Sequence, residues 1–433
     1  MRFSILSIGT ELNLGLIANT NSKFIAELLT DAGLECNYML TVMDNMKDIV
    51  DALGICCRHS DIVIISGGLG PTDDDLTREA VAEFLGRKLV KLESLKSSSL
   101  KFLKYIKNDQ VIKNLERQSH IPEGSLPIKP RIGSASGFIV KYGNGLIFSI
   151  PGVPREMEDM FRHDVMPSIK DFMSQQKSGA QPGGSEPKKD IIIKKMVMLS
   201  TDISESQMEF SIRDIKPLAK KLSVEIGVTA NPGLIKIMLI ARSGSGHECD
   251  KNLKTIEKNI KKVIGDHIYW KGDGAIGDSI KAAIKKSKKN ISICTAESIT
   301  GGLIWSLITD TPGSSQYFLG SVVSYSSFAK QNILGVGSDL INLKGAVSRD
   351  VCMEMAKKAR LLFNADFAIS ATGIAGPTSP EAGKTIGLVY IGIAGPDGYE
   401  EFYEKQFIGT RADIKFRTAQ FILNRLRLAI LKM

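Results

Sequence analysis

The feature that most constrains the fold is that short apolar runs end in glycine-bearing turns. Residues 3–8 (FSILSI) stop at Gly9, residues 61–66 (DIVIIS) enter GGLGPT, and residues 291–295 (ISICT) enter AESITGG. Such runs predict buried strands. Helical spacing of apolar residues follows them, so the chain is predicted to be an α/β protein, with a largely parallel sheet in its N-terminal part.

Length and local composition divide the chain. Its 433 residues are more than one hydrophobic core usually serves. Residues 174–189 are polar and rich in Gly, Pro and Ser, which is typical of a linker or loop. The predicted parts are a parallel-sheet domain at 1–170, a flexible linker or loop at 171–190, a small α+β connecting module at 191–270, and a second α/β domain at 271–433.

Charge and cysteine content narrow the class of protein. The formal net charge is +9, but the basic residues are scattered and no helix-turn-helix, zinc-finger or RNP-type motif occurs, so no nucleic-acid partner is predicted. Six cysteines without a CxxC pattern indicate reduced thiols. No apolar stretch approaches bilayer length and no signal peptide is indicated, so we expect a cytoplasmic protein without a membrane partner.

The turn after residues 61–66 is a candidate phosphate site. Glycine at positions 67, 68 and 70 lets backbone N–H groups approach phosphate oxygens, and a threonine hydroxyl can add a further donor. Ligands of parallel sheets bind where such turns gather at the carboxyl ends of strands. No Gly-Lys-Ser/Thr follows, so a P-loop is not indicated. The predicted substrate-binding residues are Gly67, Gly68, Gly70 and Thr72.

Acidic residues lie beside this turn. Three aspartates at 73–75 would repel a phosphate unless a divalent cation lay between them, and Glu11 in the first turn could complete such a site. The predicted metal ligands are Glu11, Asp74 and Asp75. The alternative from the residues alone is ordinary capping, because aspartates near a helix N-terminus complement its dipole.

Several N-terminal motifs together resemble a known family. IGTELNLG, IANTNSKFIAELL, SGGLGPTDDDLTREAVAEFLG and PGVPREMEDM are similar to the molybdopterin-binding-type domain at the front of CinA proteins, over residues 1 to about 165. The resemblance implies a metal-dependent ADP-ribose pyrophosphatase, whose acidic positions match Glu11, Asp74 and Asp75.

One N-terminal segment departs from that family. Residues 129–137 (KPRIGSASG) carry Arg131 and Ser136 where the family usually has prolines. A molybdopterin- or nucleotide-binding module without turnover is therefore the alternative function of the front domain.

In the C-terminal part, Ser298 follows a predicted buried strand and is expected at the start of a helix. Gly301 and Gly302 would then fall in the first helical turn. Unpaired N–H groups of such a turn can stabilise an oxyanion or a phosphate. The alternative is that Ser298 only caps the helix.

A serine nucleophile needs a base, and the sequence limits the choice. The five histidines, at 59, 120, 163, 247 and 267, all precede residue 271, which excludes a Ser-His-Asp triad within this domain. A carboxylate, a tyrosinate or a neutral lysine remains. Tyr325 and Lys330 lie in one segment, where a strand-to-helix change could turn both towards Ser298. The alternative is a solvated helix lysine.

The C-terminal motifs also resemble the CinA family. AES-TGG, PGSS-F-G, V-Y---AK--LGV, G-VS and TGIAGP occur in family order across residues 276–433, with Ile299 and Ser321 as departures. The resemblance implies a CinA-type amidase domain that hydrolyses the carboxamide of nicotinamide mononucleotide without a cofactor, and we expect a homodimer. It implies Ser298 as nucleophile and Tyr325 and Lys330 as its activating pair. The implied substrate residues are Gly301, Gly302, Thr372, Gly373, Gly376 and Arg411.

Overall fold

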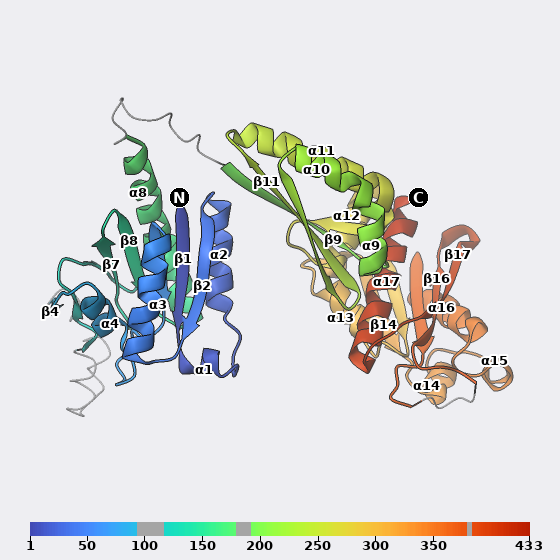
Figure 1. The fold of residues 1–433 in the computed structure, drawn as a ribbon. Coiled ribbons are helices and arrows are strands. Elements are labelled where there is room, and N and C mark those ends of the chain that lie inside the picture. The colour runs from blue at the N-terminus through green and yellow to red at the C-terminus, as the bar shows by residue number, and fades with distance from the viewer. Residues whose placement is uncertain (93–116, 179–191, 379–382) are drawn as a thin grey trace. The chain divides into compact units, whose positions relative to one another are not determined.

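The chain forms two compact units, Met1–Ile193 and Lys194–Met433 (Figure 1). The computed structural model describes residues 1–92, 117–178, 192–378 and 383–433.

Unit 1 contains a six-stranded sheet in the order β2-β1-β3-β8-β7-β6. Strands β2, β1, β3 and β8 are parallel to one another, whereas β7 pairs antiparallel with both β8 and β6. The largely parallel N-terminal sheet is confirmed. The strands are β1 (Arg2–Ile8), β2 (Glu35–Val42), β3 (Ile62–Ser66), β6 (Leu126–Ile128), β7 (Gly137–Tyr142) and β8 (Gly145–Ile150), with a separate pair β4 (Leu89–Lys91) and β5 (His120–Pro122).

Both faces of the central strands are buried, which explains their continuous apolar runs. On β1, Phe3 and Ile5 belong to one hydrophobic cluster, and Leu6 and Ile8 to another on the opposite face. The first cluster packs on α2, α7 and α8, and the second on α3 and α4. The helices of this unit are α1 (Thr10–Asn13), α2 (Thr20–Asp31), α3 (Met46–His59), α4 (Thr77–Phe84), α7 (Pro154–Met160) and α8 (Met166–Ser178).

The predicted linker at 171–190 is wrong in its first part. Residues 171–178 belong to α8, which is continuous with α7 through a π-helical turn at Phe161–Val165. Ile169 of α8 is fully buried against the sheet, so packing extends the helix further than its polar sequence suggested. Residues 179–190 of the predicted linker lie outside the described residues.

The first part of unit 2 is an α+β module. Its four-stranded sheet has the order β10-β11-β9-β12, and α11 packs on it through an apolar stripe that includes Leu253, Ile256 and Ile260. Its elements are β9 (Ile192–Ser200), α9 (Glu205–Ile212), α10 (Lys216–Lys221), β10 (Val224–Asn231), β11 (Leu234–Ser243), α11 (Gly246–Ile264) and β12 (Ile268–Lys271).

The rest of unit 2 is built on a five-stranded sheet in the order β14-β13-β15-β16-β17. Its first three strands are parallel to one another, and β16 pairs antiparallel with both β15 and β17. The predicted second α/β fold is therefore also confirmed. The strands are β13 (Ile293–Glu297), β14 (Phe318–Val323), β15 (Phe367–Gly373), β16 (Leu388–Ala394) and β17 (Glu400–Gln406). The helices are α12 (Ile276–Ser287), α13 (Leu303–Thr309), α14 (Ser327–Asn332), α15 (Ser338–Lys344), α16 (Arg349–Phe363) and α17 (Arg411–Leu431).

The α+β module and the C-terminal sheet share one hydrophobic core. Leu199 and Tyr269 of the module belong to the same buried cluster as Ile276 and Ile280 of α12. Polar contacts join them as well, because the Asp202 carboxylate accepts hydrogen bonds from Lys405 and Arg425. The two parts of Lys194–Met433 therefore stabilise each other.

No helix within the described residues is both long and apolar enough to cross a membrane.

Candidate functional sites

The structure brings Ser298 and Lys330 into direct contact. Ser298 follows β13, where its N–H donates to the Ala371 carbonyl at 2.9 Å and its side chain is almost fully buried (7% of the residue is exposed). Lys330 comes from the short helix α14 and is 2% exposed. Its Nζ lies 2.8 Å from Ser298 Oγ and 2.9 Å from the Ser324 carbonyl. A buried lysine is therefore hydrogen-bonded to the predicted nucleophile.

The turn after Ser298 differs from the expected helix start. Residues 299–302 form turns, and α13 begins only at Leu303. Gly301 and Gly302 have φ of +59° and +94°, a left-handed conformation that glycine adopts without steric cost. The prediction that Ser298 starts a helix with both glycines in its first turn is therefore wrong.

A buried carboxylate organises this turn. Glu297 is fully buried and accepts hydrogen bonds from the amides of Gly302, Ile304 and Trp305 and from the Thr300 hydroxyl, at 2.8–3.1 Å. These amides belong to the start of α13, where unpaired N–H groups favour a negative charge.

Glu297 also corrects the predicted oxyanion donors. The Gly302 amide is bound to Glu297 and cannot also stabilise an oxyanion. The amides of residues 299–301, by contrast, have no hydrogen-bond acceptor within the described part of the chain. They are the donors that the turn leaves for a ligand.

We predict that Glu297→Ala lowers the free energy of unfolding by about 3 kcal/mol, because each hydrogen bond to a buried charge contributes about 1.5–3 kcal/mol. Chemical denaturation of the full chain measures this, with the exposed Glu404→Ala as control. If Glu297→Ala unfolds at the same denaturant concentration as the unchanged protein, the carboxylate does not hold the turn together.

Tyr325 and Arg411 form a second contact near the turn. The Arg411 guanidinium donates to the Tyr325 hydroxyl and to the Gly376 carbonyl, each at 2.7 Å. Tyr325 is 60% exposed, and among the described residues its hydroxyl makes no hydrogen bond to Ser298 or Lys330. Of the predicted activating pair, only Lys330 contacts the serine in this structure.

The other predicted substrate residues lie around the end of β15. The buried Thr372 hydroxyl donates to the Ala346 carbonyl at 3.1 Å, so its proton is not available to a ligand in this structure. A Cβ at Gly373 would lie 2.6 Å from the Leu388 carbonyl oxygen, so close strand packing requires this glycine. Gly376 has φ of +81° and offers its carbonyl to Arg411.

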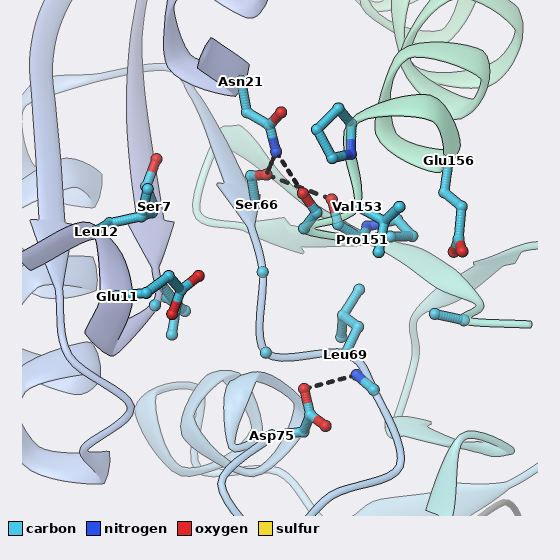
Figure 2. Close-up of a pocket in the computed structure, with 18 of the residues that line it drawn as sticks. Ser7, Glu11, Leu12, Asn21, Ser66, Leu69, Asp75, Pro151, Val153 and Glu156 are labelled. Carbon is cyan, nitrogen blue, oxygen red and sulfur yellow. Dashed lines mark hydrogen bonds between the residues drawn. The ribbon is translucent and has the colours of Figure 1, made fainter. Parts of the chain in front are cut away.

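In unit 1, all the predicted residues except Thr72 line one pocket of about 480 Å³, part of which Figure 2 shows. It lies at the carboxyl ends of β1, β3 and β8. Asn21 projects from α2 and donates to Ser66 Oγ at 3.1 Å and to the Gly152 carbonyl at 2.7 Å, which joins the loops around the pocket (Figure 2). The predicted residues that line the pocket are Glu11, Gly67, Gly68, Gly70, Asp74 and Asp75.

The turn itself uses most of the predicted phosphate donors. The Gly67 amide donates to the Ile150 carbonyl, and the amides of Gly70 and Thr72 donate to Asp75. Added Cβ atoms at Gly67 and Gly68 would collide with the Ile8 carbonyl oxygen and the Thr77 hydroxyl. These glycines are therefore required by close packing within the turn. The prediction that the backbone amides of Gly67, Gly70 and Thr72 bind a phosphate is wrong, because all three donate to acceptors within the protein.

The predicted metal ligands are only partly available. Asp75 accepts from the Gly70 amide with one oxygen and from Thr72 with the other, as expected of a turn-capping residue. Within the described residues, no group of three or more His, Cys, Asp or Glu side chains could hold a metal ion. Glu11 and Asp74 line the same pocket.

Two acidic residues of the sites were not identified from the sequence. Glu156 of α7 projects towards the unit 1 pocket (Figure 2), and burial raises the pKa of its carboxyl. Glu297 stands inside the quoted AES-TGG motif. The sequence did contain a signal for Glu297, because it ends a predicted buried strand just before a glycine-rich turn. A carboxylate buried there needs hydrogen-bond donors from the protein to offset its loss of hydration.

Comparison with known proteins accounts for nearly the whole chain. A family described as "Probable molybdopterin binding domain" matches residues 4–171, "Damage-inducible protein CinA KH domain" matches residues 196–269, and "CinA C-terminal domain" matches residues 276–430.

Individual relatives agree with these matches. A "Putative competence-damage inducible protein" of Halothermothrix orenii is 36% identical over 96% of this chain and 95% of its own length. A "CinA-like protein" of Dictyoglomus thermophilum is 36% identical over 100% of both chains. The crystal structure of a CinA protein from Thermoplasma acidophilum is 32% identical with a TM-score of 0.36, covering 40% of this chain and 97% of its own. The identity and coverage of the Halothermothrix orenii and Dictyoglomus thermophilum relatives show that the chain belongs to the CinA family of competence- and damage-inducible proteins.

Proposed function

We propose that the C-terminal part of unit 2 hydrolyses the carboxamide of nicotinamide mononucleotide to nicotinate mononucleotide and ammonia. The observation that carries the proposal is the 2.8 Å contact between Lys330 Nζ and Ser298 Oγ. A neutral amine at this distance can accept the hydroxyl proton as Ser298 attacks.

The reaction would proceed in two stages. Ser298 Oγ bonds to the carboxamide carbon while its proton passes to Lys330 Nζ. The tetrahedral oxyanion is held by amides of residues 299–301, which have no acceptor among the described residues. Lys330 returns the proton to the leaving nitrogen, and ammonia departs.

Water then attacks the acyl carbon in the second stage. It gives one proton to Lys330, which returns it to Ser298 Oγ as the ester bond breaks, and nicotinate mononucleotide is released. The positive pyridinium ring withdraws electrons from the carbonyl, so a single amine can serve as base in both stages.

The test is a panel of nucleotides incubated with the full chain, with ammonia and phosphate products measured separately. We expect ammonia from nicotinamide mononucleotide. Absence of ammonia from every pyridine carboxamide in the panel would refute the amidase.

A second function is proposed for unit 1, because its pocket combines acids with backbone donors. Gly68 and Leu69 have amides without an acceptor among the described residues, and Glu11 and Asp74 line the same pocket. We propose a pyrophosphatase acting on ADP-ribose, with Glu11 and Asp74 holding a divalent cation. When bound, the cation would neutralise phosphate charge and activate water. Binding of a nucleotide or molybdopterin without turnover is the alternative.

We predict that EDTA abolishes cleavage of ADP-ribose to AMP and ribose 5-phosphate but leaves ammonia release unchanged, because the base proposed for the amidase is the Lys330 amine in contact with Ser298. Both products are measured in one reaction mixture, and excess Mg²⁺ or Mn²⁺ should restore cleavage. Equal loss of both activities would contradict two independent sites.

A further inference from the structure

Lys415 is a cation in unit 2 for which the amidase described above has no use. It lies one helical turn after Arg411 on α17 and is half-buried. Among the described residues, its Nζ has no hydrogen-bond or ion-pair partner, whereas Lys405 and Lys432, on β17 and at the end of α17, bind Asp202 and Glu401. A half-buried ammonium loses part of its hydration, and without a partner in the protein this loss is not offset. A bound anion would supply the missing hydrogen bonds.

The position of Lys415 connects it to the serine turn. Its Nζ lies 3.6 Å from the point where a Cβ would stand on Gly301. Gly301 is three residues after Ser298 and belongs to the segment whose free amides face a ligand in the proposed reaction. The charge of Lys415 therefore lies beside the turn that carries the nucleophile.

Lys415 also lines a cavity of about 890 Å³. One wall is the first turn of α17, and another is Leu303 of α13. A third wall is the tip of the β10–β11 hairpin, with Asn231 and Pro232, which belongs to the α+β module.

The hairpin tip is fixed against α17. An added Cβ at Gly233 would lie 3.1 Å from the Arg417 Cα, and the Gly233 carbonyl accepts from the Thr201 hydroxyl at 2.8 Å. The cavity is therefore formed by elements in firm contact, and its shape does not depend on a free loop.

The charges in the cavity favour an anion. Lys415 and Arg411 are cationic, and Asp413 is the one acid among the lining residues. The Asp413 carboxylate is engaged by the Thr410 amide and hydroxyl, both at 2.8 Å. Arg411 already donates to Tyr325 and Gly376, so Lys415 offers the donors that are not yet used.

We propose that this cavity is the phosphate subsite of the amidase, in which Lys415 binds the 5′-phosphate and the hairpin tip closes the site. The inference rests on the proposed amidase function. It makes the α+β module part of substrate recognition and assigns Lys415 as a specificity residue for the phosphorylated substrate over the nucleoside.

The experiment uses the full chain and two substrates, nicotinamide mononucleotide and the nucleoside that lacks its phosphate. Lys415→Gln should lower the preference for the nucleotide, as the ratio of kcat/KM values, by about tenfold, because a charge-assisted hydrogen bond is lost. The change should lie mainly in KM for the nucleotide. Lys415→Arg should keep most of the preference, and Lys432→Gln, just past the end of α17, is the matched control.

Two outcomes would overturn the proposal: an unchanged preference in Lys415→Gln, or an equal fall for both substrates, which indicates a structural role. Binding of nicotinamide mononucleotide to Ser298→Ala, measured by calorimetry with and without Lys415→Gln, separates this inference from the amidase itself. Weaker binding on loss of Lys415 supports the subsite even if no ammonia is released, and equal binding refutes it.

Discussion

Replacing Ser298 with alanine is expected to lower kcat for ammonia release from nicotinamide mononucleotide by at least about 10³-fold. The change removes the atom that bonds to the substrate and leaves only binding and the amides of residues 299–301. KM should change much less, because the hydroxyl contributes to the transition state more than to binding.

The fold is expected to survive this substitution. Ser298 is held through its backbone amide, which donates to Ala371, and alanine keeps that bond. The control is Ser306→Ala, an exposed serine of α13. Near-normal turnover by Ser298→Ala, with an unchanged circular dichroism spectrum, would mean that the nucleophile lies elsewhere.

Lys330→Met should lower kcat by a similar factor, at least about 10³-fold, because methionine has nearly the same length but cannot accept a proton. Steady-state ammonia release from nicotinamide mononucleotide measures this loss, and near-normal turnover by Lys330→Met would rule out the lysine as the base.

Two lysine variants sharpen this test. Lys344→Met on the exposed part of α15 controls for a lysine-to-methionine change away from Ser298. Lys330→Arg places a guanidinium that stays protonated beside Ser298, so it should not restore turnover. Rescue by arginine would contradict a role as base and indicate a purely electrostatic one.

Much of the fold could be predicted because the central strands are buried on both faces. The apolar runs at 3–8 and 61–66 correspond to β1 and β3, which pack between helices. The sequence of β2 (Glu35–Val42) mixes polar and apolar residues because β2 is an edge strand in which no residue is buried. Such a strand is defined by pairing with β1, which local patterning does not reveal.

The candidate sites were predictable as sets of residues but not as contacts. The absence of histidine from the C-terminal domain left a carboxylate, a tyrosinate or a lysine as the base, and the structure places the Lys330 amine on Ser298. The role of Glu297 depends on where α13 begins, and the lack of an ion-pair partner for Lys415 among the described residues depends on which acids lie near it in the folded chain. Both features arise from tertiary structure, which local sequence patterns do not reveal. For the same reason, the pattern of acids after Gly70 did not show that Asp75 caps its own turn.

The central claim is that Ser298 and Lys330 act as one catalytic unit, and a double-mutant cycle tests it most directly. Steady-state kcat for ammonia release from nicotinamide mononucleotide is measured for Ser298→Ala, Lys330→Met and the double variant. We expect the double variant to be no slower than Ser298→Ala, because the base has no function once its hydroxyl is gone. Losses that multiply in the double variant would show that the two residues act independently and would contradict the proposed chemistry.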